Sequence, residues 1–239
     1  MDAGADQGEG EGGVIKIKTM KIKCEKYQLV NAHLPGEGQY IFGHQSGDSI
    51  VVYQAYKPSI ADYAVRQQVF GGSEYGLNRM SWIKPNFLWM MYRCGWAEKE
   101  HQERVLAIWI KKAVLEEILD NAVLSSFDPR YYTDRAAWQE ALLAKDVRMQ
   151  WDPDHGPDGS KLARRAIQLG IKGETLRKFA QTQIDLIEDI TEFVKEQKKH
   201  LDEGMTDLLV VPIETVWDLE NEQLKKRIGI TEVSHGYKG

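Results

Sequence analysis

One segment, from Arg79 to Arg104, restricts the fold more than any other part of this chain. It reads RMSWIKPNFLWMMYRCGWAEKEHQER, and its tryptophans fall seven residues apart, at Trp82, Trp89 and Trp96. A continuous heptad seam is excluded, because Pro85 and Gly95 interrupt any long helix here. The segment instead predicts a short strand at 79–83, followed by a helix that opens at Pro85. Core packing is the simplest reading of the three tryptophans as a set, since large aromatic side chains dominate core burial.

Strand-like and helix-like segments alternate along the rest of the chain. Val14 to His44 contains short β-prone pieces (VIKIK, MKIKCEKYQL and QYIFG) separated by turn residues. Beyond them we predict strands at 49–56, 103–111, 146–151, 164–171, 185–190 and 208–212, and helices at 58–70, 113–121, 132–144, 174–183 and 191–199. A turn-rich loop is expected at 152–159. The fold class that follows is α+β, a single domain over residues 14–239 with a mixed, largely antiparallel sheet and flanking helices.

The charge of the chain is concentrated at its amino terminus. The formal net charge is −5, and residues 1–13 carry four acidic residues without a basic one. This Gly-rich head is predicted to be a disordered tail, since it cannot bury apolar surface. The rest of the chain is close to neutral, so we expect no binding to duplex DNA. A local pocket of basic residues that binds nucleic acid is still compatible with this charge.

The cysteine count and the hydropathy bear on the compartment. The sequence has two cysteines, no run of about 18 apolar residues and no amino-terminal apolar run that resembles a signal peptide. We therefore expect a cytoplasmic protein, with the nucleus as an alternative, and no membrane partner.

Several catalytic and metal-binding patterns are absent from the sequence. It has no P-loop, no GxGxxG after a strand, no HExxH, no CxxC pair and no GxSxG elbow. The six histidines are scattered without ligand spacing, so no metal site is expected.

Three residues in or beside the predicted helix that opens at Pro85 could contact a ligand. Lys84 falls at the helix cap, where it cannot accept hydrogen bonds from the free N–H groups, so these donors and the ammonium could together hold an anion. The alternative is a solvated lysine with water at the cap. Trp89 and Arg93 lie four residues apart on one face, and they could form a cation–π pair or hold a base and a phosphate.

Two predicted strands present polar faces. In VRMQWD, alternation places Arg148, Gln150 and Asp152 on one side and Trp151 on the apolar side. These three could read a phosphate and base edges, or they could form an ordinary wet sheet face. In RRAIQLGIKGE, Arg164, Gln168 and Gly170 share one side, and Gly170 would let a ligand or backbone approach closely.

Arg165 belongs to the apolar side of that second strand. It would be costly there unless it is paired, or unless a bulge turns it outward.

A further group lies at two other strand ends. Tyr53, Gln54 and Tyr56 end the segment SIVVYQAY, where they could line a site or pack across the sheet. Glu103 opens the strand ERVLAIWI and could act as an acid, a base or a hydroxyl-orienting carboxylate. A surface ion pair with Arg104 or with a neighbouring residue is the simpler alternative for Glu103.

These motifs together resemble an uncharacterised family catalogued as domain of unknown function 4291. The resemblance covers about residues 49–196. It rests on the motifs YQAY (53–56), RMSWIKPNFLWMMYRCGW (79–96), QERVLAI (102–108), VRMQWDP (147–153) and IQLGIKGE (167–174). The chain departs from the family pattern at Asp154, where a Glu is often found, and at Arg164, where a Tyr is common. The resemblance implies one recurring set of Arg, Lys, Gln, Tyr and Trp side chains but no known reaction.

A fainter likeness, at the level of the fold only, is to ADP-ribosyltransferases and RNA 2′-phosphotransferases. It rests on the strand–helix–strand order. Their catalytic triad of the H-Y-E type is not evident in this sequence, so the likeness is one of fold alone.

The residue types lead to a first hypothesis of a nucleotide-using transferase that acts on NAD or on a nucleic-acid end. NAD is the one cofactor that this hypothesis suggests. The catalytic candidates are Glu103, Asp152 and Tyr53, and the candidate ligand-binding residues are Gln54, Tyr56, Arg79, Trp82, Lys84, Trp89, Arg93, Arg148, Gln150, Trp151, Arg165 and Gln168.

Two other hypotheses belong to different classes of protein. One is a non-catalytic reader that holds a nucleotide or a single-stranded RNA or DNA base in an aromatic pocket. The other is a protein-interaction domain whose tryptophans all lie in the core.

Overall fold

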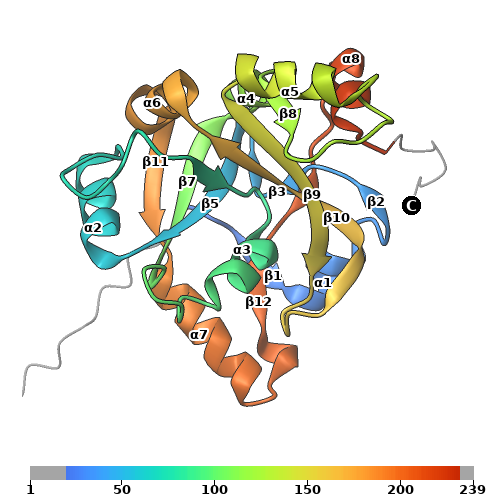
Figure 1. Cartoon of the computed structure of the whole chain (residues 1–239). Coiled ribbons are helices and arrows are strands. Elements are labelled where there is room, and N and C mark those ends of the chain that lie inside the picture. Colours follow the sequence, from blue (N-terminus) through green and yellow to red (C-terminus); the bar gives the residue numbers. More distant parts are fainter. Residues whose placement is uncertain (1–19, 232–239) are drawn as a thin grey trace, which may run out of the picture.

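The computed structural model describes residues 20–231, and these form one α+β body (Figure 1). The predicted acidic head (1–13) and the strand piece VIKIK lie outside the described residues. Within 20–231 the α-helices are α1 (Tyr27–Ala32), α2 (Pro58–Gln67), α3 (Phe87–Cys94), α4 (Lys112–Asp120), α5 (Arg135–Ala144), α6 (Gly173–Thr182), α7 (Thr191–Asp202) and α8 (Glu222–Ile228). None of them is long and apolar enough to cross a membrane.

A four-stranded antiparallel sheet forms one half of the molecule. Its strand order is β11 (Ile184–Asp189), β7 (Arg104–Lys111), β5 (Ser49–Tyr56) and β4 (Gln45–Ser46). The two central strands are apolar on both faces because both faces are covered. Ile50 and Val52 join one hydrophobic cluster, whereas Val51 and Tyr53 join a second cluster together with α3 and α7. Alternate side chains of a strand point to opposite faces, which explains why both clusters meet at β5.

A five-stranded mixed sheet forms the other half. Its order is β2 (Gly38–Gln39), β10 (Lys161–Ile171), β9 (Val147–His155) and β8 (Ala122–Leu124), and β6 (Ser81–Ile83) also pairs with β10. The pairs β10–β2 and β9–β8 are parallel, while β10–β9 and β10–β6 are antiparallel. The first hydrophobic cluster fills the space between the two sheets, as it combines Ile108 of β7 with Met149 and Ile167 of this sheet.

Smaller elements complete the body. β1 (Cys24–Lys26) pairs with β12 (Val210–Pro212), and β3 (Phe42–Gly43) pairs with β13 (Thr215–Val216). A 3₁₀ turn, η1 (Thr206–Leu208), precedes β12. In Figure 1, β5, β7 and β11 lie side by side in one half, and β9, β10 and β2 lie in the other.

One link between the two larger sheets positions the candidate site. β6 belongs to the mixed sheet through its pairing with β10, but the next residue, Lys84, forms an isolated bridge with Tyr53 of β5. Tyr53 N donates to Lys84 O at 2.7 Å, and Lys84 N donates to Tyr53 O at 3.3 Å. The chain between Ser81 and Pro85 is therefore fixed on both sides.

The predicted fold class, α+β with mostly antiparallel strands, is confirmed. The expectation of one sheet is wrong, because the strands fall into two larger and two small sheets. The extended reading of 20–29 is confirmed for Cys24–Lys26 (β1) and wrong from Tyr27, where α1 begins and whose N–H donates to Leu209 O across the molecule. The predicted loop at 152–159 begins later, because β9 continues to His155.

The predicted start of α3 is two residues too early. The helix begins at Phe87, after the cap residue Asn86, and Phe87 N donates to Glu214 Oε1 at 2.7 Å. Lys84 therefore lies in extended chain before the helix. The anion site that we predicted from a lysine at this helix cap is not formed, because a carboxylate already accepts from the first helical N–H.

Candidate functional site

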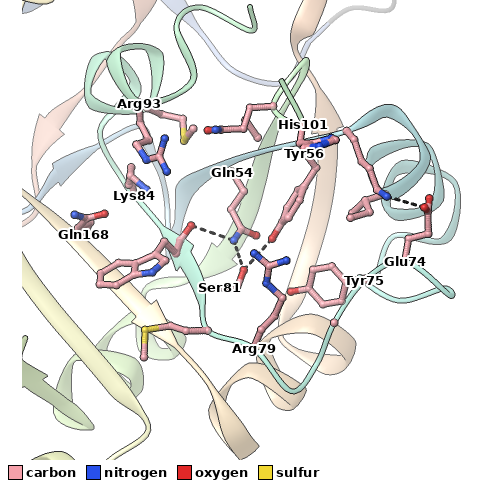
Figure 2. Close-up of a pocket in the computed structure, with 18 residues that line it drawn as sticks. Gln54, Tyr56, Glu74, Tyr75, Arg79, Ser81, Lys84, Arg93, His101 and Gln168 are labelled. Atoms are coloured by element: carbon pink, nitrogen blue, oxygen red, sulfur yellow. Dashed lines mark hydrogen bonds and ion pairs between the residues drawn. The ribbon is translucent and has the colours of Figure 1, made fainter. Parts of the chain in front are cut away.

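A cavity of about 610 Å³ opens where β5, β6, α3 and the loop before β6 meet (Figure 2). Among its lining residues are seven of the predicted ligand-binding positions, which come from three separate sequence motifs. They are Gln54, Tyr56, Arg79, Trp82, Lys84, Arg93 and Gln168. The fold thus brings together side chains that are more than 100 residues apart in the sequence.

A hydrogen-bonded group forms the floor of this cavity. Gln54 Nε2 donates to Ser81 Oγ at 2.7 Å and to Trp82 O at 3.1 Å. The Tyr56 hydroxyl and Ser81 Oγ are 2.8 Å apart. Gln54 Oε1 is buried, and within the described residues it has no hydrogen-bond partner. These contacts fix the end of β5 against β6 and leave the cavity with a rigid polar base.

The cavity carries an excess of positive charge. Lys57 is paired with Glu74 at 2.6 Å, but Arg79, Lys84 and Arg93 form no ion pair and no side-chain hydrogen bond with any residue in 20–231. Figure 2 shows these three side chains around the same space, with Gln54 and Ser81 between them. Three cations without acidic partners in one concavity create a positive potential that favours an anionic ligand.

Lys84 is the most buried of the three cations, with 3% of its surface exposed. Its Nζ lies 5.2 Å from the centre of the Trp89 ring. Burial, reinforced by the charge of Arg93, lowers the pKa of Lys84 to about 8.

Trp82 forms an aromatic wall, and Gly170 makes room for it. The two residues are directly paired across β6 and β10. A Cβ atom at Gly170 would lie 2.9 Å from Trp82 Cζ2 and 2.6 Å from Met80 Sδ. The close approach that we predicted at Gly170 is thus made by two side chains from the same motif, which lie on the backbone of β10.

The other two tryptophans of the motif pack in the interior. Trp89 and Trp96 are each 6% exposed, and neither lines the cavity. Trp89 contacts the rings of Tyr92 and His155, while Trp96 packs edge-on against Phe87. Core packing, the simplest reading of the tryptophan set, therefore describes these two positions and not Trp82.

Part of the predicted set lines a second cavity, of about 620 Å³. Gln150, Trp151, Asp152 and Arg165 contribute to its walls. Trp151 Nε1 donates to Ile228 O at 2.7 Å, which anchors the indole against α8. The two sets are connected at one point, since Gln168 Nε2 of the first cavity donates to Gln150 Oε1 at 2.9 Å and to Asp152 Oδ2 at 2.7 Å.

Arg148 lies in neither cavity, which corrects its predicted convergence with the other basic residues. Its guanidinium donates to the carbonyl groups of Leu142, Lys145 and Val147, at and just beyond the end of α5. These backbone acceptors lie within six residues of Arg148, and they hold its guanidinium away from the two cavities. The role of Arg148 in the structure is to satisfy the carbonyl groups at a helix end.

The family of the chain is decided by a match that covers this whole region. The family described as Domain of unknown function (DUF4291) matches residues 40–217. The chain belongs to the DUF4291 family. The match is longer than the resemblance predicted over 49–196, and it includes every residue that lines the first cavity.

The DUF4291 assignment brings no reaction with it, and no curated protein matches the chain. Nothing in these comparisons supports the faint likeness to ADP-ribosyltransferases. What the DUF4291 cavity can do must therefore be argued from its own side chains.

The three catalytic candidates of this DUF4291 chain do not line the first cavity. Tyr53 is fully buried on the opposite face of β5 against Phe87, and burial raises the pKa of its hydroxyl. Asp152 reaches the cavity only through Gln168, and burial raises the pKa of its carboxyl group.

Glu103 accepts the N–H of His101 at 2.8 Å, and backbone hydrogen bonds lower the pKa of its carboxyl group. It does not pair with Arg104, which binds Asp62 and Asp189 instead. Gln102 and His101, the two residues before it, line the cavity, whereas Glu103 does not.

Some lining residues were not predicted from the sequence. Ser81 lies inside the tryptophan motif, and its alternation with Trp82 was the available signal for a second polar wall. Lys57, Glu74 and Tyr75 come from turn regions without a periodic pattern. No group of three or more His, Cys, Asp or Glu residues that could hold a metal is found between residues 20 and 231.

Proposed function

We propose that this cavity binds a phosphate-bearing aromatic ligand and that the protein is a nucleotide-using transferase acting on NAD or on a nucleic-acid end. The observation that carries the proposal is the convergence of Arg79, Lys84 and Arg93, without acidic partners in the described residues, beside the indole of Trp82. Phosphate groups satisfy such cations, and an aromatic wall suits the base of a nucleotide.

The size and polarity of the cavity support this ligand class. A volume of about 610 Å³ lies within the usual range for small-molecule sites. Gln54 and Gln168 supply amide groups at fixed positions, because their hydrogen bonds to Ser81, Gln150 and Asp152 orient them. Amide groups of this kind can recognise the hydrogen-bonding edge of a base.

The arrangement favours group transfer that is promoted by orienting the ligand and by stabilising its negative charge. The three cations could hold phosphate oxygens while charge develops during transfer. Of the three carboxylate and hydroxyl candidates, Asp152 has the best support as the catalytic carboxylate, because Gln168 connects it to the cavity. Tyr53 is fully buried and Glu103 does not line the cavity, which argues against direct roles for them.

The concave cluster of basic side chains also favours this proposal over a protein-interaction domain. Such a domain would have no need for three cations around one cavity, one of them, Lys84, buried. A non-catalytic reader makes the same prediction for binding, and it differs from a transferase only in leaving the ligand unchanged.

The first test is a thermal-shift experiment on the full chain with NAD, ADP-ribose, ATP, GTP, a 2′-phosphorylated dinucleotide and short RNA. A ligand present at about 100 times its Kd stabilises the folded state by about 2.7 kcal/mol. We expect a shift that is lost in Arg79→Ala and in Arg93→Ala and is kept in Arg165→Ala, which changes the second cavity. No shift across the panel, or a shift that all three variants retain, contradicts the proposal.

Chromatography of the incubated ligand then separates the two classes of function. Conversion of the ligand by the wild-type chain, absent in Arg79→Ala, supports a transferase. Binding without conversion supports a reader and overturns the transferase.

A further inference from the structure

Lys84 is held in place more firmly than an ordinary surface lysine. Its backbone N–H and C=O both pair with Tyr53, at 3.3 and 2.7 Å. Pro85 follows it and restricts Lys84 to an extended conformation. With its backbone fixed at the junction of the two sheets and 3% of its surface exposed, Lys84 delivers its amine to a defined place in the cavity wall.

The surroundings of that amine do not favour a permanent ammonium. Nζ lies over the Trp89 ring and has no hydrogen-bond or ion-pair partner among residues 20–231. Burying a charged group without a partner of opposite charge costs free energy. Burial therefore stabilises the neutral amine of Lys84 relative to the ammonium.

The charged and titratable groups around Lys84 come from two elements. Arg93 of α3 disfavours the ammonium, whereas Asp152 of β9 and Cys94 of α3 favour it. Burial outweighs these charges, and the pKa of Lys84 falls to about 8. A substantial fraction of the amine is then neutral near physiological pH.

We propose that Lys84 is a nucleophilic amine which forms an imine with a phosphate-bearing aldehyde held in the cavity by Arg79 and Arg93. A lysine becomes a nucleophile when it is desolvated or lies next to another cation, and Lys84 meets both conditions. The expected ligand class is a sugar phosphate in its aldehyde form, either free or at an abasic position of a nucleic-acid strand. The phosphate part of this inference rests on the proposed function, but the amine part does not.

The chemistry needs no oxidant or reductant. The lone pair of Nζ forms a bond to the carbonyl carbon, and the carbonyl π electrons move to the oxygen. A proton leaves the nitrogen and one reaches the oxygen, which gives a carbinolamine. Loss of one water molecule then produces the C=N bond.

The test uses pyridoxal 5′-phosphate as the probe, with sodium cyanoborohydride to reduce the imine to a stable secondary amine. The labelled chain is digested, and the modified peptides are identified by mass spectrometry. Lys57 is an internal comparison, because it lines the same cavity but is paired with Glu74. At pH 8 a pKa of about 8 gives roughly a hundredfold more neutral amine than an ordinary lysine. We therefore expect Lys84 to be labelled about ten to a hundred times faster than Lys57, since nucleophilicity falls together with pKa.

Matched variants separate the amine from the charge. Lys84→Arg keeps a cation at the position and should remove the modified peptide while the chain still melts cooperatively. Arg79→Ala should slow labelling by pyridoxal 5′-phosphate but not by pyridoxal, which lacks the phosphate. Equal labelling of Lys57 and Lys84, or no label on Lys84 in the folded wild-type chain, overturns the inference.

The experiment also distinguishes this inference from the proposed function. A nucleotide-induced thermal shift together with an unlabelled Lys84 leaves the proposed function standing and refutes the amine. Fast labelling of Lys84 by pyridoxal and by its phosphate alike supports the amine and refutes the phosphate-holding role of the arginines. Trapping with ribose 5-phosphate, compared with a single-stranded oligonucleotide that carries an abasic site, then identifies the source of the aldehyde.

Discussion

Arg164 Nε donates to Asp154 Oδ2 at 2.7 Å, and the two side chains are only 5% and 2% exposed. The remaining guanidinium contacts are made by Asn31 Oδ1 at 2.8 Å and by Pro35 O at 3.4 Å. These same two positions stand out in the sequence, and the structure shows that they are partners. A charge that would be costly alone is buried here as an ion pair.

Removal of one partner should therefore be strongly destabilising. Asp154→Ala leaves the Arg164 guanidinium buried without its ion-pair partner, and we expect a loss of about 3–5 kcal/mol in the free energy of unfolding. Urea denaturation measures it. The double variant Asp154→Leu with Arg164→Met should recover most of that loss, because two apolar side chains replace both charges. A loss below about 1 kcal/mol in Asp154→Ala would show that the pair is not buried in solution.

The fold class could be predicted where a segment's own residues determine its structure. The strands at 49–56 and 104–111 are apolar on both faces, and helices such as α4 and α6 carry clear periodic faces. Elements that depend on distant partners could not be predicted. α1 has six residues, with only Val30 buried, and its first N–H is accepted by Leu209 O. The start of α3 likewise depends on Glu214, which is 127 residues away.

The candidate site shows the same division between local and distant causes. Residue type and motif membership indicated the seven predicted residues that line the cavity. Periodicity did not separate them from their neighbours, because Tyr53, grouped with Gln54 and Tyr56, and Trp89, grouped with Arg93, are both buried away from it.

Arg164 is buried and Arg165 is exposed, the reverse of what alternation along the strand assigned to them. The register of β9 and β10 is irregular between Lys161 and Arg165. The cost of an arginine on the apolar side indicated a bulge as one option, but the local sequence did not decide between a bulge and a paired arginine.

Arg148 provides a test of a structural role against a binding role. Arg148→Ala removes three hydrogen bonds to backbone carbonyl groups, so we expect the free energy of unfolding to fall by about 1–3 kcal/mol. The nucleotide-induced thermal shift, measured relative to the variant's own melting temperature, should be unchanged. Loss of that shift with normal stability would return Arg148 to the ligand site.

Gly170 should be sensitive to a single methyl group. Gly170→Ala places a Cβ atom 2.9 Å from the Trp82 ring and 2.6 Å from Met80 Sδ, so the packing of these side chains on β10 must shift. We expect a loss of about 1–3 kcal/mol in the free energy of unfolding, together with weaker binding of the ligand that shifts the wild-type chain. Gly36→Ala is the matched control, since no atom lies within 4 Å of its added Cβ. Equal behaviour of the two variants would contradict the packing of Trp82 on Gly170.

Lys84 should make stability depend on pH in a known direction. Its pKa falls from 10.5 in the unfolded chain to about 8 in the folded protein. Between these values the unfolded chain binds more protons, so the free energy of unfolding rises with pH across this window. Below pH 8 both states are protonated, and the full cost of about 3 kcal/mol for charging the buried amine is present.

Lys84→Met removes that cost. We expect it to raise the free energy of unfolding at pH 7 by up to about 3 kcal/mol, and we expect the gain to disappear near pH 10.5, where the wild-type amine is neutral in the folded protein. Lys57→Met, at a lysine paired with Glu74, should show no such gain at pH 7. Urea denaturation of the wild type and both variants at the two pH values measures the difference. A gain of equal size at both values would mean that packing, and not the charge of Lys84, limits stability at this site.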